Sequence, residues 1–138
     1  MKSWLSYDFN DMRLEEAEMP VAEPGWVVCR TRVLQLSITE VAEFRGLPVS
    51  SHEIYKEMWA KKRPLPLFGH EFCAEVVEVG AGVENLHVGD RVFYHRGAQC
   101  GRCKYCKAGM PQFCRSSTFG GEDTPGCLAE YFPVPAHV

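Results

Sequence analysis

The sequence predicts a mainly β domain that has short helices and an inserted cysteine lobe. Three observations lead to this fold class. Several runs alternate apolar and polar residues, which is the period of a half-buried strand. Only one segment shows the three-to-four-residue apolar spacing of a helix. Four of the seven cysteines lie within residues 100–114, a density typical of a metal-binding loop.

The first predicted strand covers residues 25–37. Arginines occupy positions 30 and 32 on its predicted solvent face. The opposite face is formed by Val27, Cys29, Thr31 and Val33. This alternation predicts a strand with one buried face.

Three further runs predict strands. Residues 71–79 are rich in β-branched side chains and stop at a Gly-Ala-Gly turn. Residues 89–94 lead from a Gly-Asp turn into a third strand, and residues 127–135 alternate again. Pro133 has no backbone N–H to donate, so the last strand is expected at an edge of the sheet.

One helix is predicted after residue 50. Ser50 and Glu53 have the spacing of a capping box, which places the helix start there. Basic residues at 61–63 fill the last turn before Pro64, which ends the helix. The predicted apolar face consists of Ile54, Tyr55, Met58 and Trp59.

Length and composition exclude several classes of protein. A chain of 138 residues is expected to form one domain. The net charge of −3 argues against a nucleic-acid partner, which would require a basic face. No apolar run approaches the length of a membrane span, and the N-terminus has no apolar signal core. We therefore expect a cytoplasmic protein, where an odd number of cysteines argues against a disulfide framework.

The four clustered cysteines have the spacing C-x2-C-x2-C-x7-C and are Cys100, Cys103, Cys106 and Cys114. Four thiolates complete a tetrahedral shell around Zn(II), and a closed shell indicates one structural zinc per chain. Gly101 and Gly109 give the backbone the freedom that tight turns need. The nearby basic side chains that offset the thiolate charge are Arg102, Lys104 and Lys107.

Two alternatives exist for this cluster. Four free thiols would be unusual at this density. An iron–sulfur cluster of the bacterial ferredoxin type would need a last gap of three residues followed by proline, whereas Arg115 follows Cys114 here. Zinc is therefore favoured. The remaining cysteines, in strand patterns, are interpreted as small core residues: Cys29, Cys73 and Cys127.

Four sequence motifs follow one another along the chain: GHEFCAEVVEVGAGV at 69–83, VGDRV at 88–92, the four cysteines, and PGCLAEYFPVPA at 125–136. In this combination the chain resembles the N-terminal part of the zinc-containing medium-chain alcohol dehydrogenases, from about Val27 onward. The resemblance implies a GroES-like β-barrel over residues 1–138, with a zinc lobe at about 97–116. It also implies a neighbouring Rossmann domain that binds NAD or NADP.

That Rossmann domain is not expected within these residues. A dinucleotide site needs G-x-G-x-x-G between a strand and a helix, and the nearest match, GAGVEN at 80–85, lacks the third glycine. We therefore expect the chain to belong to a longer enzyme and to be inactive alone. The resemblance implies oxidation of an alcohol, polyol or sugar-like substrate, or reduction of the carbonyl, and leaves room for a homo-oligomer. The alternative is a non-catalytic GroES-like zinc-binding module used for binding or assembly.

The resemblance also places a catalytic site. Ser37 stands where the family has a cysteine ligand of a catalytic zinc, and Glu40 stands where it has an aspartate that orients a histidine. Thr39 matches the hydroxyl residue that takes the substrate proton. His70 matches the histidine ligand, and Glu71 matches the adjacent glutamate, itself a ligand in polyol-dehydrogenase-like members.

A serine hydroxyl is a poor zinc ligand because it stays protonated near neutral pH. Three alternatives therefore remain for a second, catalytic zinc: ligation by His70, Glu71 and a later residue; weak binding; or loss of the metal and a different reaction. Another histidine, His95, is interpreted as a loop residue, with a substrate contact as the alternative. A histidine that the family uses as a proton relay is replaced by Ala42.

Overall fold

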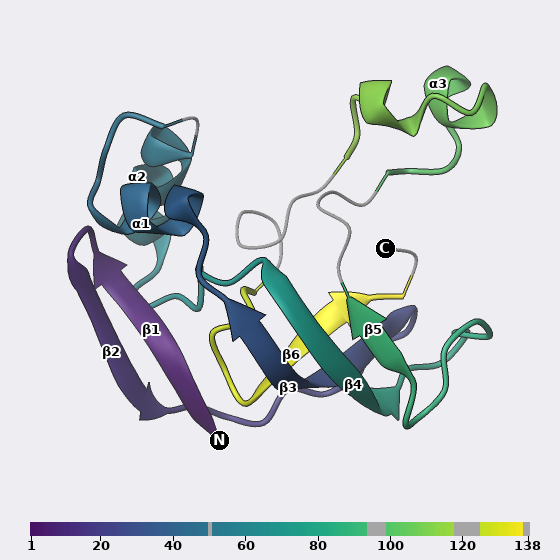
Figure 1. Cartoon of the computed structure of the whole chain (residues 1–138), viewed down its shortest axis with the longest axis horizontal. Helices are drawn as coiled ribbons and strands as arrows, with labels where there is room; N and C mark the ends of the chain where they lie inside the picture. The colour runs from purple at the N-terminus through teal and green to yellow at the C-terminus, as the bar shows by residue number, and fades with distance from the viewer. Residues whose placement is uncertain (50, 94–98, 118–124, 137–138) are drawn as a thin grey trace.

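The computed structural model describes residues 1–49, 51–93, 99–117 and 125–136. A four-stranded antiparallel sheet in the order β5-β4-β3-β6 forms its centre (Figure 1). The strands are β3 (Trp26–Gln35), β4 (Glu71–Val79), β5 (Arg91–Phe93) and β6 (Tyr131–Pro135). The predicted mainly β fold with short helices is confirmed, and the strand that contains Pro133 lies at the sheet edge as expected.

An N-terminal hairpin was not predicted. It consists of β1 (Lys2–Asp8) and β2 (Asp11–Glu16), joined at Asn10, whose φ is 59°. Isolated bridges from Ser3 to Ala129 and from Ser6 to Leu65 tie the hairpin to the rest of the domain. The alternation of apolar and polar residues in the hairpin is weak, and many of its residues are charged. Its sequence pattern therefore resembles that of a solvated segment.

The described helices are α1 (Ile38–Phe44), α2 (His52–Lys61), α3 (Lys104–Lys107) and a 3-10 turn, η1 (Pro111–Phe113). α2 is the predicted helix, and its buried residues are Tyr55 and Trp59. Ile54 is 40% exposed, so its predicted place on the apolar face is wrong. The helix starts after Ser51, whose side chain makes no capping bond. The predicted cap at Ser50, like His95, lies outside the described residues.

β3 shows why simple alternation fails after Thr31. The register with β4 shifts between Thr31 and Val33, which is a β-bulge. A bulge reverses the faces that follow it, so Val33 is 65% exposed instead of buried, and Leu34 packs inward. Cys73 lies opposite Val33 and is exposed as well, which corrects its assignment to the core.

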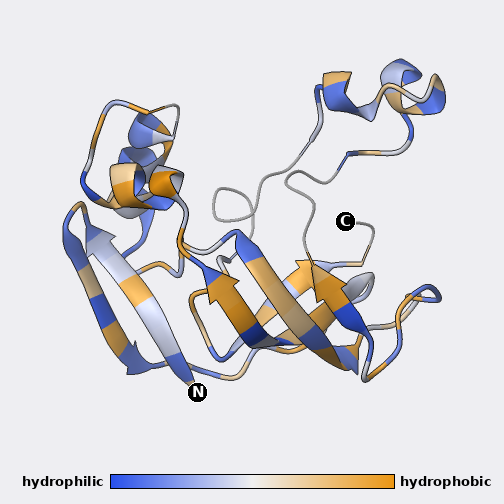
Figure 2. Cartoon of the chain, in the orientation of Figure 1, coloured by the Kyte–Doolittle hydropathy of each residue, from blue (hydrophilic) through white to orange (hydrophobic). Residues whose placement is uncertain are grey.

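Two apolar clusters stabilise the domain. One fills the space beside the four-stranded sheet, with Val27, Cys29 and Phe132 among its buried members. The other joins α2 to the hairpin around Tyr55 and Trp59. Figure 2 shows hydrophobic residues along the strands of the four-stranded sheet. Burial raises the pKa of Cys29 to about 11 and that of Cys127 to about 12, so both thiols stay protonated at neutral pH.

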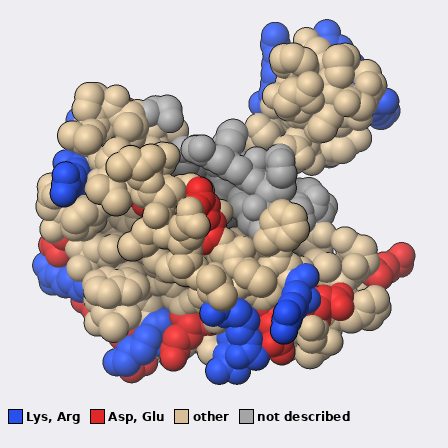
Figure 3. All heavy atoms as spheres, viewed as in Figure 1, with Lys and Arg blue, Asp and Glu red and all other residues tan. Residues whose placement is uncertain are grey.

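Opposite charges lie side by side on the surface. Along the lower edge of the face in Figure 3, Lys and Arg side chains alternate with Asp and Glu. One such pair on the sheet joins Arg32 to Glu75 at 2.6 Å. Among the described helices, none is long and apolar enough to cross a bilayer.

Two glycines allow a close crossing of backbones. The N–H groups of Gly126, Cys127 and Leu128 donate to the carbonyls of residues 66, 69 and 68 at 2.7, 3.0 and 3.1 Å. A Cβ added at Gly126 would lie 1.9 Å from the Phe68 carbonyl oxygen, and one at Gly69 would lie 2.6 Å from the Leu128 nitrogen. The segment that precedes His70 is therefore fixed against the segment that precedes β6.

Gly126→Ala should lower the free energy of unfolding by about 3 kcal/mol, because neither backbone at this crossing has room to move away from an added methyl group. The matched control is Gly82→Ala, where a Cβ meets nothing within 4 Å and only the positive φ of 79° is unfavourable. That control should lose only about 1 kcal/mol. Urea unfolding of both variants measures the difference, and equal losses would contradict the crossing.

Candidate functional site

The site begins at His70, immediately before β4. Gly69 precedes it with φ +103°, a conformation that favours glycine. This backbone turn and the crossing with residues 126–128 direct the imidazole toward the start of α1. The side chain of His70 is 14% exposed.

α1 begins at the predicted SITE stretch, residues 37–40, and Ser37 is its N-cap. The Ser37 hydroxyl accepts a hydrogen bond from the Glu40 backbone N–H at 3.2 Å. The Glu40 carboxylate accepts from the Ser37 backbone N–H at 3.0 Å. This reciprocal capping box was missed, although Ser37 and Glu40 have the required spacing. It turns the chain from β3 into a helix and holds Glu40 beside His70.

Three groups surround the His70 ring. Glu40 Oε1 lies 3.5 Å from Nδ1. Ser37 Oγ lies 3.4 Å from Nε2, and Glu71 Oε1 lies 3.9 Å from the same nitrogen. The structure therefore brings together four of the five predicted residues. Thr39, the fifth, is half-buried in the first turn of α1, two residues beyond Ser37.

Glu40 is the buried acid of this group, with 4% of its surface exposed. Burial alone raises the pKa of its carboxyl, but the contact with His70 at 3.5 Å and the hydrogen bond from the Ser37 backbone N–H outweigh burial and leave the pKa below its usual value. Glu40 is thus a carboxylate at neutral pH. A carboxylate at Nδ1 favours the tautomer with a proton on Nδ1 and a lone pair on Nε2, directed toward Ser37 and Glu71.

The chemistry of these donors falls short of a catalytic zinc site, which uses three protein ligands. His70 Nε2 is a good ligand. Glu71 offers a carboxylate that is 43% exposed. The third position holds the neutral Ser37 hydroxyl, which already accepts the Glu40 N–H. Within the described ranges, only the four clustered cysteines form a group of three or more suitable side chains.

That four-cysteine cluster is fully assembled. The sulfur atoms of Cys100, Cys103, Cys106 and Cys114 all lie within 4.8 Å of one another. A tetrahedral zinc with bonds of ~2.3 Å requires sulfur separations of about 3.8 Å, so the cluster fits the ion. Gly101 and Gly109 have φ values of 65° and 71°, as the predicted tight turns require.

Backbone N–H groups contribute to the electrostatics of the cluster. Hydrogen bonds from the backbone of Arg102 and Cys103 lower the pKa of Cys100 to about 6. Burial and the neighbouring thiols raise the pKa of Cys106 to about 12. The thiols therefore cannot all ionise on their own, and full ionisation requires a cation at the centre. Figure 1 shows this lobe, with α3 and η1, apart from the sheet.

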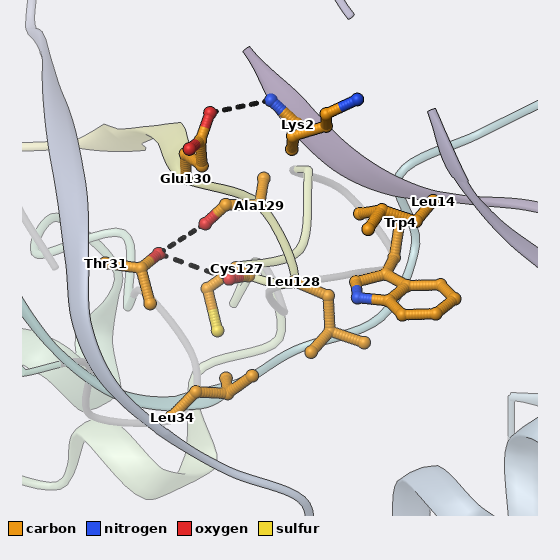
Figure 4. Close-up of a pocket in the computed structure, with 9 residues that line it drawn as sticks. All are labelled: Lys2, Trp4, Leu14, Thr31, Leu34, Cys127, Leu128, Ala129 and Glu130. Atoms are coloured by element: carbon orange, nitrogen blue, oxygen red, sulfur yellow. Dashed lines mark hydrogen bonds between the residues drawn. The ribbon is translucent and has the colours of Figure 1, made fainter. Parts of the chain in front are cut away.

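A separate pocket of about 330 Å³ opens between the hairpin and residues 127–130 (Figure 4). Trp4 and Leu128 line its apolar wall, while Thr31 Oγ1 donates to the Ala129 carbonyl at 2.6 Å. None of the predicted site residues lines it. The pocket has no local sequence signal, because one of its walls is the N-terminal hairpin, which the sequence pattern did not predict.

Known proteins share the sequence pattern. Residues 23–138 match the family described as the alcohol dehydrogenase GroES-like domain. L-Threonine 3-dehydrogenase of Pyrococcus furiosus is 37% identical over 123 residues, which cover 89% of this chain and 33% of that protein. The chain thus spans about a third of the length of this relative.

Solved structures share the fold as well. Galactitol-1-phosphate dehydrogenase from Escherichia coli has a TM-score of 0.78 and 26% identity, over 98% of this chain and 36% of that chain. The cobalt- and zinc-bound thermostable alcohol dehydrogenase from Pyrobaculum aerophilum has a TM-score of 0.78 and 27% identity, over 99% of this chain and 39% of that chain. The chain belongs to the zinc-containing medium-chain alcohol dehydrogenase family and comprises its GroES-like domain.

Proposed function

We propose that the chain is the N-terminal, substrate-side domain of an NAD(P)-dependent dehydrogenase. Its substrate would be an alcohol, polyol or sugar-like molecule, or the corresponding carbonyl compound. The observation that carries the proposal is the arrangement of His70 between the Glu40 carboxylate and the Ser37 hydroxyl, at the positions where the family has its catalytic site. Family membership supports the reaction class.

The residues of this chain have distinct proposed roles. Glu40 holds His70 in one tautomer, and His70 with Glu71 forms the polar wall against which the substrate oxygen lies. The Thr39 hydroxyl hydrogen-bonds that oxygen, accepts its proton and releases its own hydroxyl proton to water as the carbonyl forms. A bound nicotinamide supplies the hydride acceptor. The Ser37 hydroxyl keeps the first turn of α1, and so Thr39 and Glu40, in place.

Zinc is the proposed cofactor of the lobe, with one ion per chain on Cys100, Cys103, Cys106 and Cys114. The domain is proposed to cover residues 1–138, with the lobe at about 97–116. The proposed partners are small-molecule alcohol or carbonyl substrates, and neither nucleic acid nor a membrane is proposed as a partner. The proposed compartment is the cytoplasm, and the proposed assembly is a homo-oligomer. The net charge of −3 supports the absence of a nucleic-acid partner, and the odd number of cysteines supports a reducing compartment.

A non-catalytic zinc module is the second candidate. The observation that favours it is the incomplete donor set at His70, where a hydroxyl that already caps a helix replaces a thiolate. In this case the lobe would serve binding or assembly, and the residues around His70 would contribute only to the stability of the fold.

The decisive experiment compares the isolated chain with the longest reading frame that contains it. Residues 1–138 should bind neither NAD nor NADP at micromolar concentrations in calorimetry, because no glycine-rich phosphate-binding turn is present in the sequence. The longer product should bind one of them and form NAD(P)H with a panel of alcohols and polyols. Tight cofactor binding by residues 1–138 would refute the proposal that the cofactor is bound by another domain. Absence of turnover by the protein from the longer reading frame would favour the non-catalytic zinc module.

A further inference from the structure

α1 has an unusual pattern of burial. Its two buried side chains are both glutamates, Glu40 and Glu43. The apolar side chain of Ile38 is 83% exposed, and that of Val41 is 37% exposed. A helix of seven residues is not stable by itself, so its position depends on contacts with its surroundings. Phe44 supplies an apolar contact at the end of the helix, against Phe68.

Glu43 is bound from the start of α2. Ser51 Oγ donates to Glu43 Oε1 at 2.6 Å. Tyr55 OH donates to Glu43 Oε2 at 3.3 Å. Glu43 is 7% exposed, Tyr55 is 3% exposed and Ser51 is fully buried, so water does not compete for these bonds. Buried hydrogen bonds to a carboxylate are stronger and more directional than exposed ones.

Glu40 and Glu43 lie three residues apart, on the same side of α1. Glu40 faces His70 at 3.5 Å, and Glu43 is held by α2. The two contacts therefore fix α1 at both of its turns, one against the site and one against α2. Rotation of α1 on release of Glu43 would move Glu40 away from Nδ1, since both carboxylates belong to the same short helix.

We propose that Glu43 is a positioning residue that keeps Glu40 aligned with His70 through its hydrogen bonds to Ser51 and Tyr55. The inference rests on the proposed role of the Glu40–His70 pair. Glu43 reaches neither the imidazole nor a substrate. It determines which ring nitrogen of His70 carries the proton, and therefore which nitrogen faces the substrate side.

The test is the tautomer of His70 in the zinc-loaded chain, read from the ring nitrogen shifts of 15N-histidine-labelled protein. His70→Gln assigns the signals. Wild type should show mainly the Nδ1–H form at a pH where the ring is neutral. Glu43→Leu should reduce the ratio of the Nδ1–H to the Nε2–H form several-fold, and Glu43→Gln, which keeps one acceptor oxygen, should lie in between.

Glu57→Gln is the matched control, because it makes the same change at an exposed position of α2. It should leave the tautomer ratio at the wild-type value. A purely structural role of Glu43 would alter thermal unfolding without altering the ratio, and this outcome would overturn the proposal. If Glu43→Leu does not fold, Ser51→Ala decides, since it removes the shorter hydrogen bond without changing α1: a lowered ratio supports the proposal, and an unchanged ratio refutes it.

The outcome is independent of dehydrogenase activity. If the Glu43 variants change the tautomer ratio and the longer protein shows no turnover, the positioning role of Glu43 is supported and the proposed function is rejected. If the ratio is unchanged and the longer protein is active, the positioning role is rejected and the proposed function is supported.

Discussion

Replacing Cys103 with serine should empty the lobe of zinc and unfold it, while the sheet stays folded. Cys103 provides one of four sulfur ligands, and its Sγ also accepts the Cys106 backbone N–H at 3.5 Å as the N-cap of α3. The binding free energy of a structural zinc is about 10–16 kcal/mol and is mostly folding energy of the segment that binds it. Zinc content should fall from about one ion per chain to near zero.

The sheet should survive because its apolar cluster involves no residue of the lobe. Amide signals of residues 99–117 should collapse to disordered shifts, and those of β3 and β4 should stay in place. Cys73→Ser is the control, since Cys73 is an exposed strand residue outside the cluster, and it should keep full zinc content. Zinc retained by Cys103→Ser, or iron with sulfide in the wild type, would contradict the assignment.

Ser37→Cys should raise the zinc content from about one to nearly two ions per chain at saturating metal. A thiolate at this position joins His70 and Glu71 and completes the three protein ligands of a catalytic zinc site. The 3.4 Å between Ser37 Oγ and His70 Nε2 already suits two ligands of one ion. Loss of the serine cap should lower stability by only about 1 kcal/mol, because Cys103 shows that a cysteine can cap a helix in this chain.

The double variant Ser37→Cys/His70→Gln separates a new site from adventitious binding. The second ion should disappear in it, since the thiolate and Glu71 alone are too few ligands. Metal analysis together with cobalt absorption in the ligand-field region gives both the number of ions and their geometry. A second zinc on His70 in the wild-type chain would show that Ser37 is not a lost ligand.

Local patterns were enough to predict much of this domain. Residues 71–79 form a strand with the predicted bounds because their β-branched run ends at a turn that the adjacent glycines require. The four cysteines were recognised as one site because two-residue gaps bring neighbouring sulfur atoms together in almost any loop. The GHE element indicated His70 for the same reason, since a short motif depends little on distant parts of the chain.

Contacts between distant segments decided which strand residues are exposed and how α1 is held. Val33 and Cys73 are exposed because a bulge in β3 reverses its faces, and the position of a bulge depends on pairing with β4. α1 exists because Ser37 and Glu40 cap each other and because α2 binds Glu43. The sequence by itself indicated the four cysteines as a metal-binding cluster and His70 with its neighbours as the candidate catalytic site. Only the tertiary structure decided that Ser37 lies beside His70 and that α2 holds α1 through Glu43, because the partner of Ser37 is 33 residues away and those of Glu43 are 8 and 12 residues away.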